Sequence, residues 1–127
     1  MKSYLSKSKY TAFRQCPKIL WMKSYKPEEE TIDPALKTRF EAGNEVGDLA
    51  MRLFGDFEEV TVTDSNDRLD LKEMLRRTED CLSRGVENIC EASFSWDGNY
   101  CAVDILHRQG DGYAIYEVKS SSNSYSD

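Results

Sequence analysis

The chain has no apolar run long enough for a membrane-spanning helix, which argues against an integral helical membrane protein. It has only four cysteines, and none of them is in a Cys-x-x-Cys spacing. With no signal peptide, this pattern favours a reducing cytoplasm over a disulfide framework, so we expect a cytoplasmic protein. Internal repeats and domain linkers are also lacking before the serine-rich end, and we expect one domain.

The composition is that of a soluble globular domain. Its 127 residues are 39% hydrophobic and 31% charged, which suffices for a modest core. Periodicity and turn residues predict a sheet flanked by helices, an α+β fold. We expect helices over residues 8–22, 33–55 and 68–84, a strand over 57–62, and a closing three-strand meander over 89–119.

Acidic residues are absent before Glu28, although the net charge is −6. Seven basic residues occupy this segment: Lys2, Lys7, Lys9, Arg14, Lys18, Lys23 and Lys26. Aromatic residues are interleaved with them: Tyr4, Tyr10, Phe13, Trp21 and Tyr25. This combination suits a groove that follows a phosphate backbone and stacks unpaired bases, with Lys7, Lys9, Arg14 and Lys18 as candidate contacts. The alternative is an amphipathic helix whose aromatics are core and whose lysines are solvated.

Two turns set the register of the meander. A turn centred on Asp97-Gly98 places Glu91 opposite Asp104, and one centred between Gly110 and Asp111 places Asp104 opposite Glu117. Lys119 shares the face of Glu117 because side chains alternate along a strand. The opposite face is then apolar and is expected to pack on the core, with Cys90, Ala92, Phe94, Trp96, Cys101, Val103, Ile105, Ala114, Tyr116 and Val118.

Three acids in a row across neighbouring strands repel one another, at about 0.2–1 kcal/mol per opposed pair. A bound divalent cation would remove that cost, so the pattern predicts a metal site beside the Lys119 ammonium. The alternative is that the acids lie on the solvated face of an antiparallel meander. A slip of either turn would move one acid to the other face.

The order Asp104, Glu117, Lys119 resembles the acid and Glu-x-Lys motif of the PD-(D/E)XK nuclease superfamily. The segment Leu5-Ser6-Lys7-Ser8-Lys9-Tyr10, running into Gln15-Cys16-Pro17-Lys18 and Trp21, is similar to the entry of RecB-like exonucleases, including the CRISPR-associated ones. The resemblance covers nearly the whole chain. It implies a restriction-endonuclease-like α/β fold with a mixed, mainly antiparallel sheet.

The resemblance also implies a metal-dependent deoxyribonuclease that hydrolyses phosphodiester bonds in DNA, acting on single strands or ends. Asp104, Glu117 and the Val118 carbonyl would hold Mg²⁺ or Mn²⁺. Lys119 would orient or deprotonate the attacking water and stabilise the transition state. Glu91 would complete the cation shell, because the expected register places it beside Asp104.

The chain departs from these relatives on the helix before the sheet. Relatives have a metal-binding His there, and the matching position is Gly47. With Gly43 it falls on an apolar stripe, so we expect these glycines to allow close helix-to-sheet approach. The only histidine, His107, falls off the acid face and is expected at the rim.

The chain also lacks the helix and strand that follow the Glu-x-Lys strand in relatives. We therefore expect residues 1–119 to form an incomplete nuclease-like core, and residues 120–127 a polar tail leading to a missing carboxy-terminal part. The sheet edge left uncovered would allow a homodimer. An alternative is a non-catalytic nucleic-acid-docking or interaction module on a degenerate scaffold.

Cys16 matches the first cluster ligand of iron–sulfur-containing relatives, so a cluster is expected only in the longer parent protein. A helix-packing thiol is the alternative. Cys81, Cys90 and Cys101 are expected to be buried free thiols.

Overall fold

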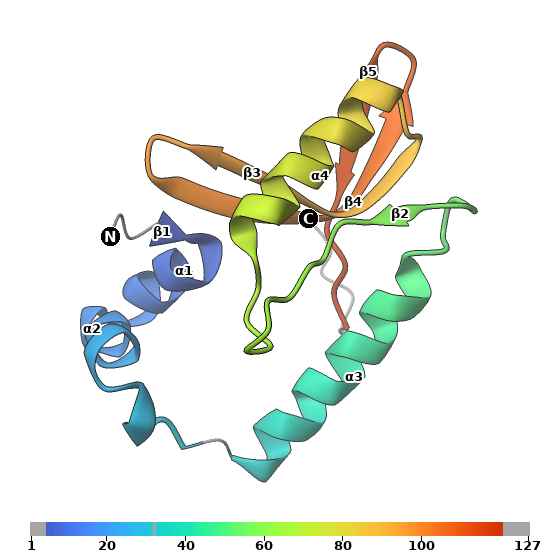
Figure 1. The fold of residues 1–127 in the computed structure, drawn as a ribbon. Helices are drawn as coiled ribbons and strands as arrows, with labels where there is room; N and C mark the ends of the chain where they lie inside the picture. The colour runs from blue at the N-terminus through green and yellow to red at the C-terminus, as the bar shows by residue number, and fades with distance from the viewer. Residues whose placement is uncertain (1–4, 32, 121–127) are drawn as a thin grey trace.

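A computed structural model describes residues 5–31 and 33–120; the residues of the predicted polar tail beyond Ser120 lie outside this range. The fold is mixed α/β, with four helices and a mixed, curled sheet among these residues (Figure 1). The elements in order are β1 (Leu5–Ser6), α1 (Lys7–Gln15), α2 (Pro17–Tyr25), the 3₁₀ turn η1 (Pro27–Glu29), α3 (Pro34–Ala50), β2 (Glu58–Glu59), α4 (Leu71–Arg84), β3 (Asn88–Trp96), β4 (Asn99–Gln109) and β5 (Gly112–Tyr116). None of the described helices is both long and apolar enough to cross a membrane.

The amino-terminal segment forms two helices, and the prediction of one helix over residues 8–22 was wrong. The break falls at Cys16, which is extended with φ −165° and ψ 124°. Proline disfavours the helical region for the residue before it, so Pro17 ends α1 and begins α2. The Ser6 hydroxyl caps α1 by accepting a hydrogen bond from the Lys9 amide at 3.2 Å.

Helix α3 begins as predicted but does not bury its apolar stripe. Asp33 caps it by accepting from the Ala35 amide at 3.0 Å, and Ala50 ends it before a series of turns that reaches Gly55. Phe40 and Leu53 are 57% and 64% exposed, so the expected burial was wrong. Only the carboxy-terminal part of α3 lies near the sheet, and the rest extends away from it (Figure 1).

The meander has the predicted register. Strands β3 and β4 are antiparallel, with Cys90 opposite Ile105 and Ala92 opposite Val103, as the Asp97-Gly98 turn requires. Strands β4 and β5 pair Ile105 with Tyr116, as the second turn requires. Two short parallel pairings were not predicted: β1 joins the start of β4, and β2 joins β3.

The faces of β3 do not alternate regularly, because Glu91 has a left-handed backbone with φ +58°. Ile89 and Ala92 are an odd number of residues apart, yet both belong to the core cluster with Val60, Cys81 and Leu106. A strand without this kink would put them on opposite faces. The predicted single apolar face was therefore wrong, and Trp96, at its far end, is 84% exposed.

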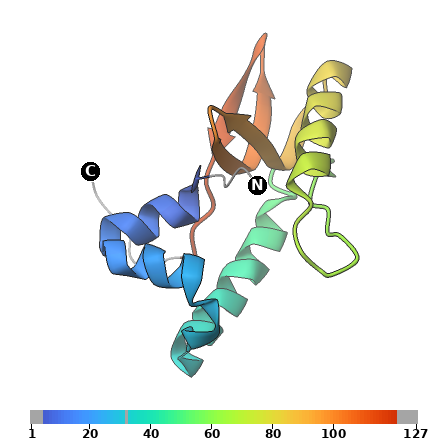
Figure 2. The same ribbon diagram turned by 60° about the vertical axis from the view of Figure 1, so that its left-hand side comes forward.

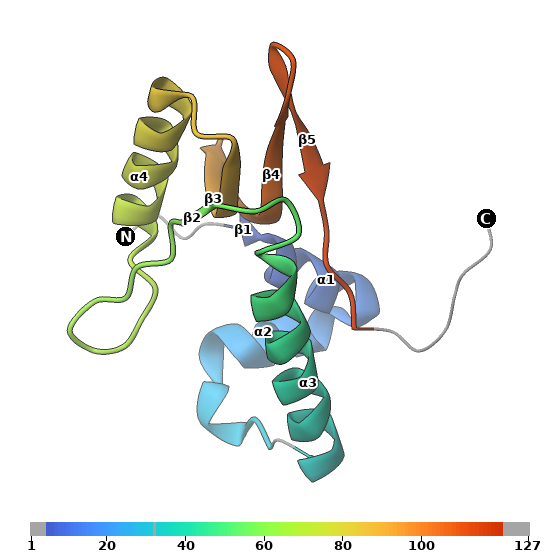
Figure 3. The same ribbon diagram turned by 90° about the vertical axis from the view of Figure 1, so that its right-hand side faces the viewer.

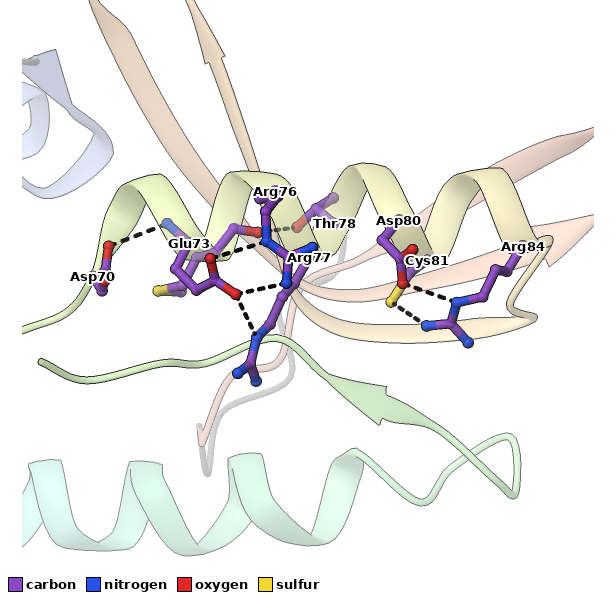
Figure 4. A network of polar contacts seen from close by, with 9 residues as sticks. Asp70, Glu73, Arg76, Arg77, Thr78, Asp80, Cys81 and Arg84 are labelled. Atoms are coloured by element: carbon purple, nitrogen blue, oxygen red, sulfur yellow. Dashed lines mark hydrogen bonds and ion pairs between the residues drawn. The ribbon is translucent and has the colours of Figure 1, made fainter.

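Helix α4 supplies the cover for one face of the sheet. Asp70 caps its start, and Gly85 ends it in the left-handed conformation with φ +70°. Within the sheet-facing stripe, buried Thr78 accepts a hydrogen bond from the Ser93 amide at 2.9 Å. Ion pairs run along the helix, from Glu73 to Arg76 and Arg77 and from Arg84 to Asp80 (Figure 4), and Arg84 also pairs with Glu58 of β2.

Candidate functional site

A cavity of about 420 Å³ lies between α3, the middle of β3 and β4, and the segment that follows β5. That segment runs beside α3 below the sheet (Figures 1 and 3). The cavity is lined by Gly43, Asn44, Gly47, Asp48, Met51, Glu91, Asp104, Ile105 and Val118. Three residues of the predicted site, from three segments of the meander, therefore share one cavity.

Glu91 and Asp104 meet at this cavity because the predicted register places them opposite each other. Positions on both sides of them are paired in that register, and the left-handed backbone of Glu91 falls between. The pKa of the Glu91 carboxyl is raised, first by burial and then by the negative charges of Asp104 and Glu59. The site thus holds a half-buried acid that repels its neighbour.

Asp104 also fixes the backbone of the next strand segment. Its Oδ2 atom accepts a hydrogen bond from the Val118 amide at 2.7 Å. This contact continues the β4–β5 alignment beyond the last paired residue, Tyr116. It holds Val118 in the cavity wall, which is where the predicted carbonyl ligand was expected.

Glu117 and Lys119 lie beside the cavity and interact with each other. Both side chains are exposed, and the Lys119 Nζ is 3.0 Å from Glu117 Oε1. The Lys7 ammonium of α1 also bonds to Glu117. Lys7 chiefly, and then Lys119, lowers the pKa of Glu117 to about 2. The pKa of Lys7 is raised, chiefly by its hydrogen bond to Glu117, and the charge of Asp104 contributes to the shift.

The described residues contain no group of three or more His, Cys, Asp or Glu side chains arranged to hold a metal ion. Two carboxylates, Glu91 and Asp104, and Val118 line the cavity on the side of the meander. Mg²⁺ commonly uses one or two protein carboxylates and keeps several waters. These oxygen donors therefore fit a partly hydrated divalent cation.

Sequence reasoning missed one charged residue of this region and one charged contact. Asp48 of α3 lines the cavity one position after the expected His site, on the same helix face as Asn44 and Met51. The spacing of these three residues could have predicted their shared face, but the apolar stripe was used to place the glycines instead. Lys7 was predicted as a nucleic-acid contact, but its bond to Glu117 had no local signal, because 110 positions separate the two residues in the chain.

The two glycines of α3 have a different role from the expected one. A Cβ atom at Gly47 would meet nothing within 4 Å, and one at Gly43 would lie 3.6 Å from the Ser120 hydroxyl, an ordinary contact. Close helix-to-sheet approach was therefore the wrong explanation. Both residues line the cavity, where the lack of side chains leaves it open.

The cysteines and the histidine are not among the residues that line this cavity. Cys81 and Cys90 are buried free thiols as predicted, and burial raises the pKa of each to about 11. Cys101 is exposed, so that prediction was wrong. Cys16 is a partly buried free thiol at the α1–α2 junction, and its role in a cluster stays a prediction. His107 stacks on Phe54 with ring centroids 3.9 Å apart.

The predicted nucleic-acid contacts lie on the two amino-terminal helices. Lys7 faces Glu117, and Lys9 lines a second, larger groove with aromatic side chains. Arg14 and Lys18 are exposed. Comparisons of the chain with family models, with curated proteins and with solved structures found no match.

Proposed function

We propose that the protein is a metal-dependent nuclease of the PD-(D/E)XK type that hydrolyses phosphodiester bonds in DNA. The observation that carries the proposal is the convergence of Glu91, Asp104 and Val118 on one cavity, with Glu117 and Lys119 beside it. The sequence order of these residues and the mixed sheet that holds them add support.

The cation would be held by the Asp104 and Glu91 carboxylates and the Val118 carbonyl. Asp48 stands on the opposite wall of the cavity, where it can bind a cation-held water. Mg²⁺ or Mn²⁺ bound there would neutralise phosphate charge and lower the pKa of a water molecule. The pKa of Glu91 is raised chiefly by burial and then by repulsion from Asp104 and Glu59, and a cation would favour the charged carboxylate against both effects.

Side chains and backbone groups of the protein would position the cation ligand and the attacking water. The Val118 amide holds Asp104 through a 2.7 Å hydrogen bond, so that its second oxygen can face the cavity. Lys119 would orient the attacking water or accept its proton, and its charge would stabilise the negative transition state. Glu117 pairs with Lys119 at 3.0 Å, which would hold the ammonium beside the cavity, and Glu117 would itself join the cation shell.

The test measures cation binding and DNA cleavage on matched variants. Calorimetric titration with Mn²⁺ should give a binding signal in the wild type that Asp104→Asn weakens tenfold or more. Asparagine keeps an oxygen for the Val118 amide, so the fold is retained. Glu45→Gln, which alters an exposed acid of α3 outside the cavity lining, is the control. Cleavage of labelled DNA should require Mn²⁺ or Mg²⁺ and should be lost in Lys119→Ala.

A non-catalytic nucleic-acid-docking module is the second candidate. It is favoured by Gly47 at the expected His position and by the engagement of Glu117 with two lysines. Equal Mn²⁺ titrations of wild type and Asp104→Asn, together with DNA binding and no cleavage, would support this module and contradict the nuclease.

A further inference from the structure

The two amino-terminal helices enclose a groove of about 750 Å³ that is separate from the acidic cavity. It is lined by Leu5, Lys9, Phe13, Pro17, Leu20, Trp21, Lys23, Ser24 and Tyr25. Figure 2 shows α1 and α2 lying next to each other on one side of the molecule. The break at Cys16-Pro17 creates the groove, because it folds α2 back against α1.

The aromatic side chains of the groove are accessible. Phe13 is 47% exposed, Trp21 53% and Tyr25 70%. Trp21 and Tyr25 lie one helical turn apart on α2, with ring centroids 5.6 Å apart and planes tilted by 40°. The alternative in which these aromatics form a core is therefore wrong for these three residues.

The charge around the groove is positive. Lys9 and Lys23 line it, and no acidic residue occurs before Glu28. Lys23 makes one long ion pair with Glu30, at 3.6 Å, between exposed side chains. Such a pair is weak and would yield to a phosphate.

We propose that this groove binds a short unpaired stretch of DNA, with bases stacked on Trp21 and Tyr25 and phosphates beside the lysines. Aromatic faces next to positive charge are the chemistry that unpaired nucleotides recognise, because paired bases have their faces covered by their neighbours. The aromatics line a hollow between helices rather than a continuous apolar face, which disfavours insertion into a bilayer. The inference rests on the proposed function, since it names a single strand as the substrate.

Helix α1 connects the groove to the proposed centre. Lys7 belongs to the same helix as Lys9 and Phe13, and it bonds to Glu117 beside the acidic cavity. A strand held on α1 and α2 would thus reach the cavity along one short helix.

The test uses binding without metal, so that it is independent of catalysis. Fluorescence anisotropy in EDTA should show that a labelled oligothymidine binds at least tenfold more tightly than the same length of duplex. Trp21→Ala should weaken this binding about tenfold, and Tyr25→Ala severalfold. Trp96→Ala, which removes an exposed tryptophan outside the groove lining, should leave it unchanged.

Tryptophan fluorescence gives a second readout that does not depend on affinity differences. The chain has two tryptophans, so Trp96→Phe leaves Trp21 as the only reporter. Oligothymidine should quench its emission by stacking. Unchanged binding in Trp21→Ala, preference for duplex, or tighter binding to anionic phosphatidylserine vesicles would overturn the groove assignment. The Mn²⁺ titration would still decide the nuclease proposal separately.

Discussion

At the scale of single residues, Glu91 is the position where backbone conformation and charge are both unusual. Left-handed backbone is rare for a residue with a side chain, and it costs about 1–2 kcal/mol. Here it occurs in the middle of a strand, and it accompanies the placement of a carboxylate in a cavity beside Asp104. Strain of this kind is often retained at functional positions.

Replacing Glu91 with Gln should stabilise the metal-free protein at pH 7. The folded-state pKa of Glu91 is raised above its ordinary value of 4.5, so the folded state binds the proton more tightly than the unfolded state. The penalty is absent below pH 4.5 and grows as pH rises through the folded-state pKa. We expect a gain of about 0.2–1 kcal/mol, the cost of one opposed carboxylate pair, in urea unfolding at pH 7.

The same measurement at pH 4 should show little difference between Glu91→Gln and wild type. Glu45→Gln, on the exposed surface of α3, should be neutral at both pH values. A loss of stability at pH 7 would mean that the Glu91 charge is compensated in the folded protein.

At the scale of elements, α4 is tied to β3 by a hydrogen bond between a helix side chain and the strand backbone. The Ser93 amide, two residues after the kink at Glu91, donates to the Thr78 hydroxyl, which in turn donates to the Met74 carbonyl. Ser93 and Thr78 are both buried, at 2% exposure each. The helix therefore satisfies a backbone donor close to the kink.

Thr78→Val should destabilise the protein by about 1–3 kcal/mol. Valine matches threonine in shape but has no hydroxyl, so the buried Ser93 amide would lose its partner. Thr78→Ser keeps the hydroxyl and should recover most of the loss. Denaturant unfolding of the three proteins gives the comparison, and a Thr78→Val protein as stable as wild type beside a destabilised Thr78→Ser protein would show that packing of the methyl group is what matters.

Some features of the helices and strands could be predicted from the sequence, and others could not. Register was predictable, because Asp97-Gly98 and Gly110-Asp111 specify turns, and both strand pairings follow from them. Helix α4 was predictable from its stripe and from Gly85. The exposure of α3 was not predictable. An apolar stripe shows that a helix has an apolar face, but it does not show which part of the protein, if any, packs on that face.

The candidate site was predictable to the same extent as the register. Opposition of Glu91 and Asp104 followed from a turn, but the cavity that they share also depends on where α3 packs. The left-handed backbone of Glu91 had no sequence signal. Gly or Asn usually marks such a conformation, whereas alternation assigns Glu91 to a regular strand. The Lys7 contact depends on tertiary structure alone.

At the scale of the whole molecule, charge is divided between the two ends of the chain. The segment before Glu28 is wholly basic, whereas the rest carries all 23 acidic residues. The ion pair between Lys7 and Glu117 joins these parts at the edge of the acidic cavity. Because the pKa of Glu117 is lowered to about 2, the carboxylate stays charged throughout the neutral range, and the pair is lost only as pH falls towards 2.

Lys7→Ala should raise the affinity for Mn²⁺, because the Lys7 ammonium and a divalent cation compete for the same Glu117 carboxylate. An exposed ion pair contributes at most about 1 kcal/mol, so the gain should be up to about fivefold in Kd by calorimetric titration at pH 7. Lys18→Ala removes an exposed lysine from α2 and should leave the affinity unchanged, which separates competition from a general loss of positive charge. The gain should also disappear in Lys7→Ala combined with Glu117→Gln, since the carboxylate that both cations need is then absent. Equal affinities in Lys7→Ala and wild type would show that Glu117 stays outside the cation shell and serves only to hold the amino-terminal helices against the meander.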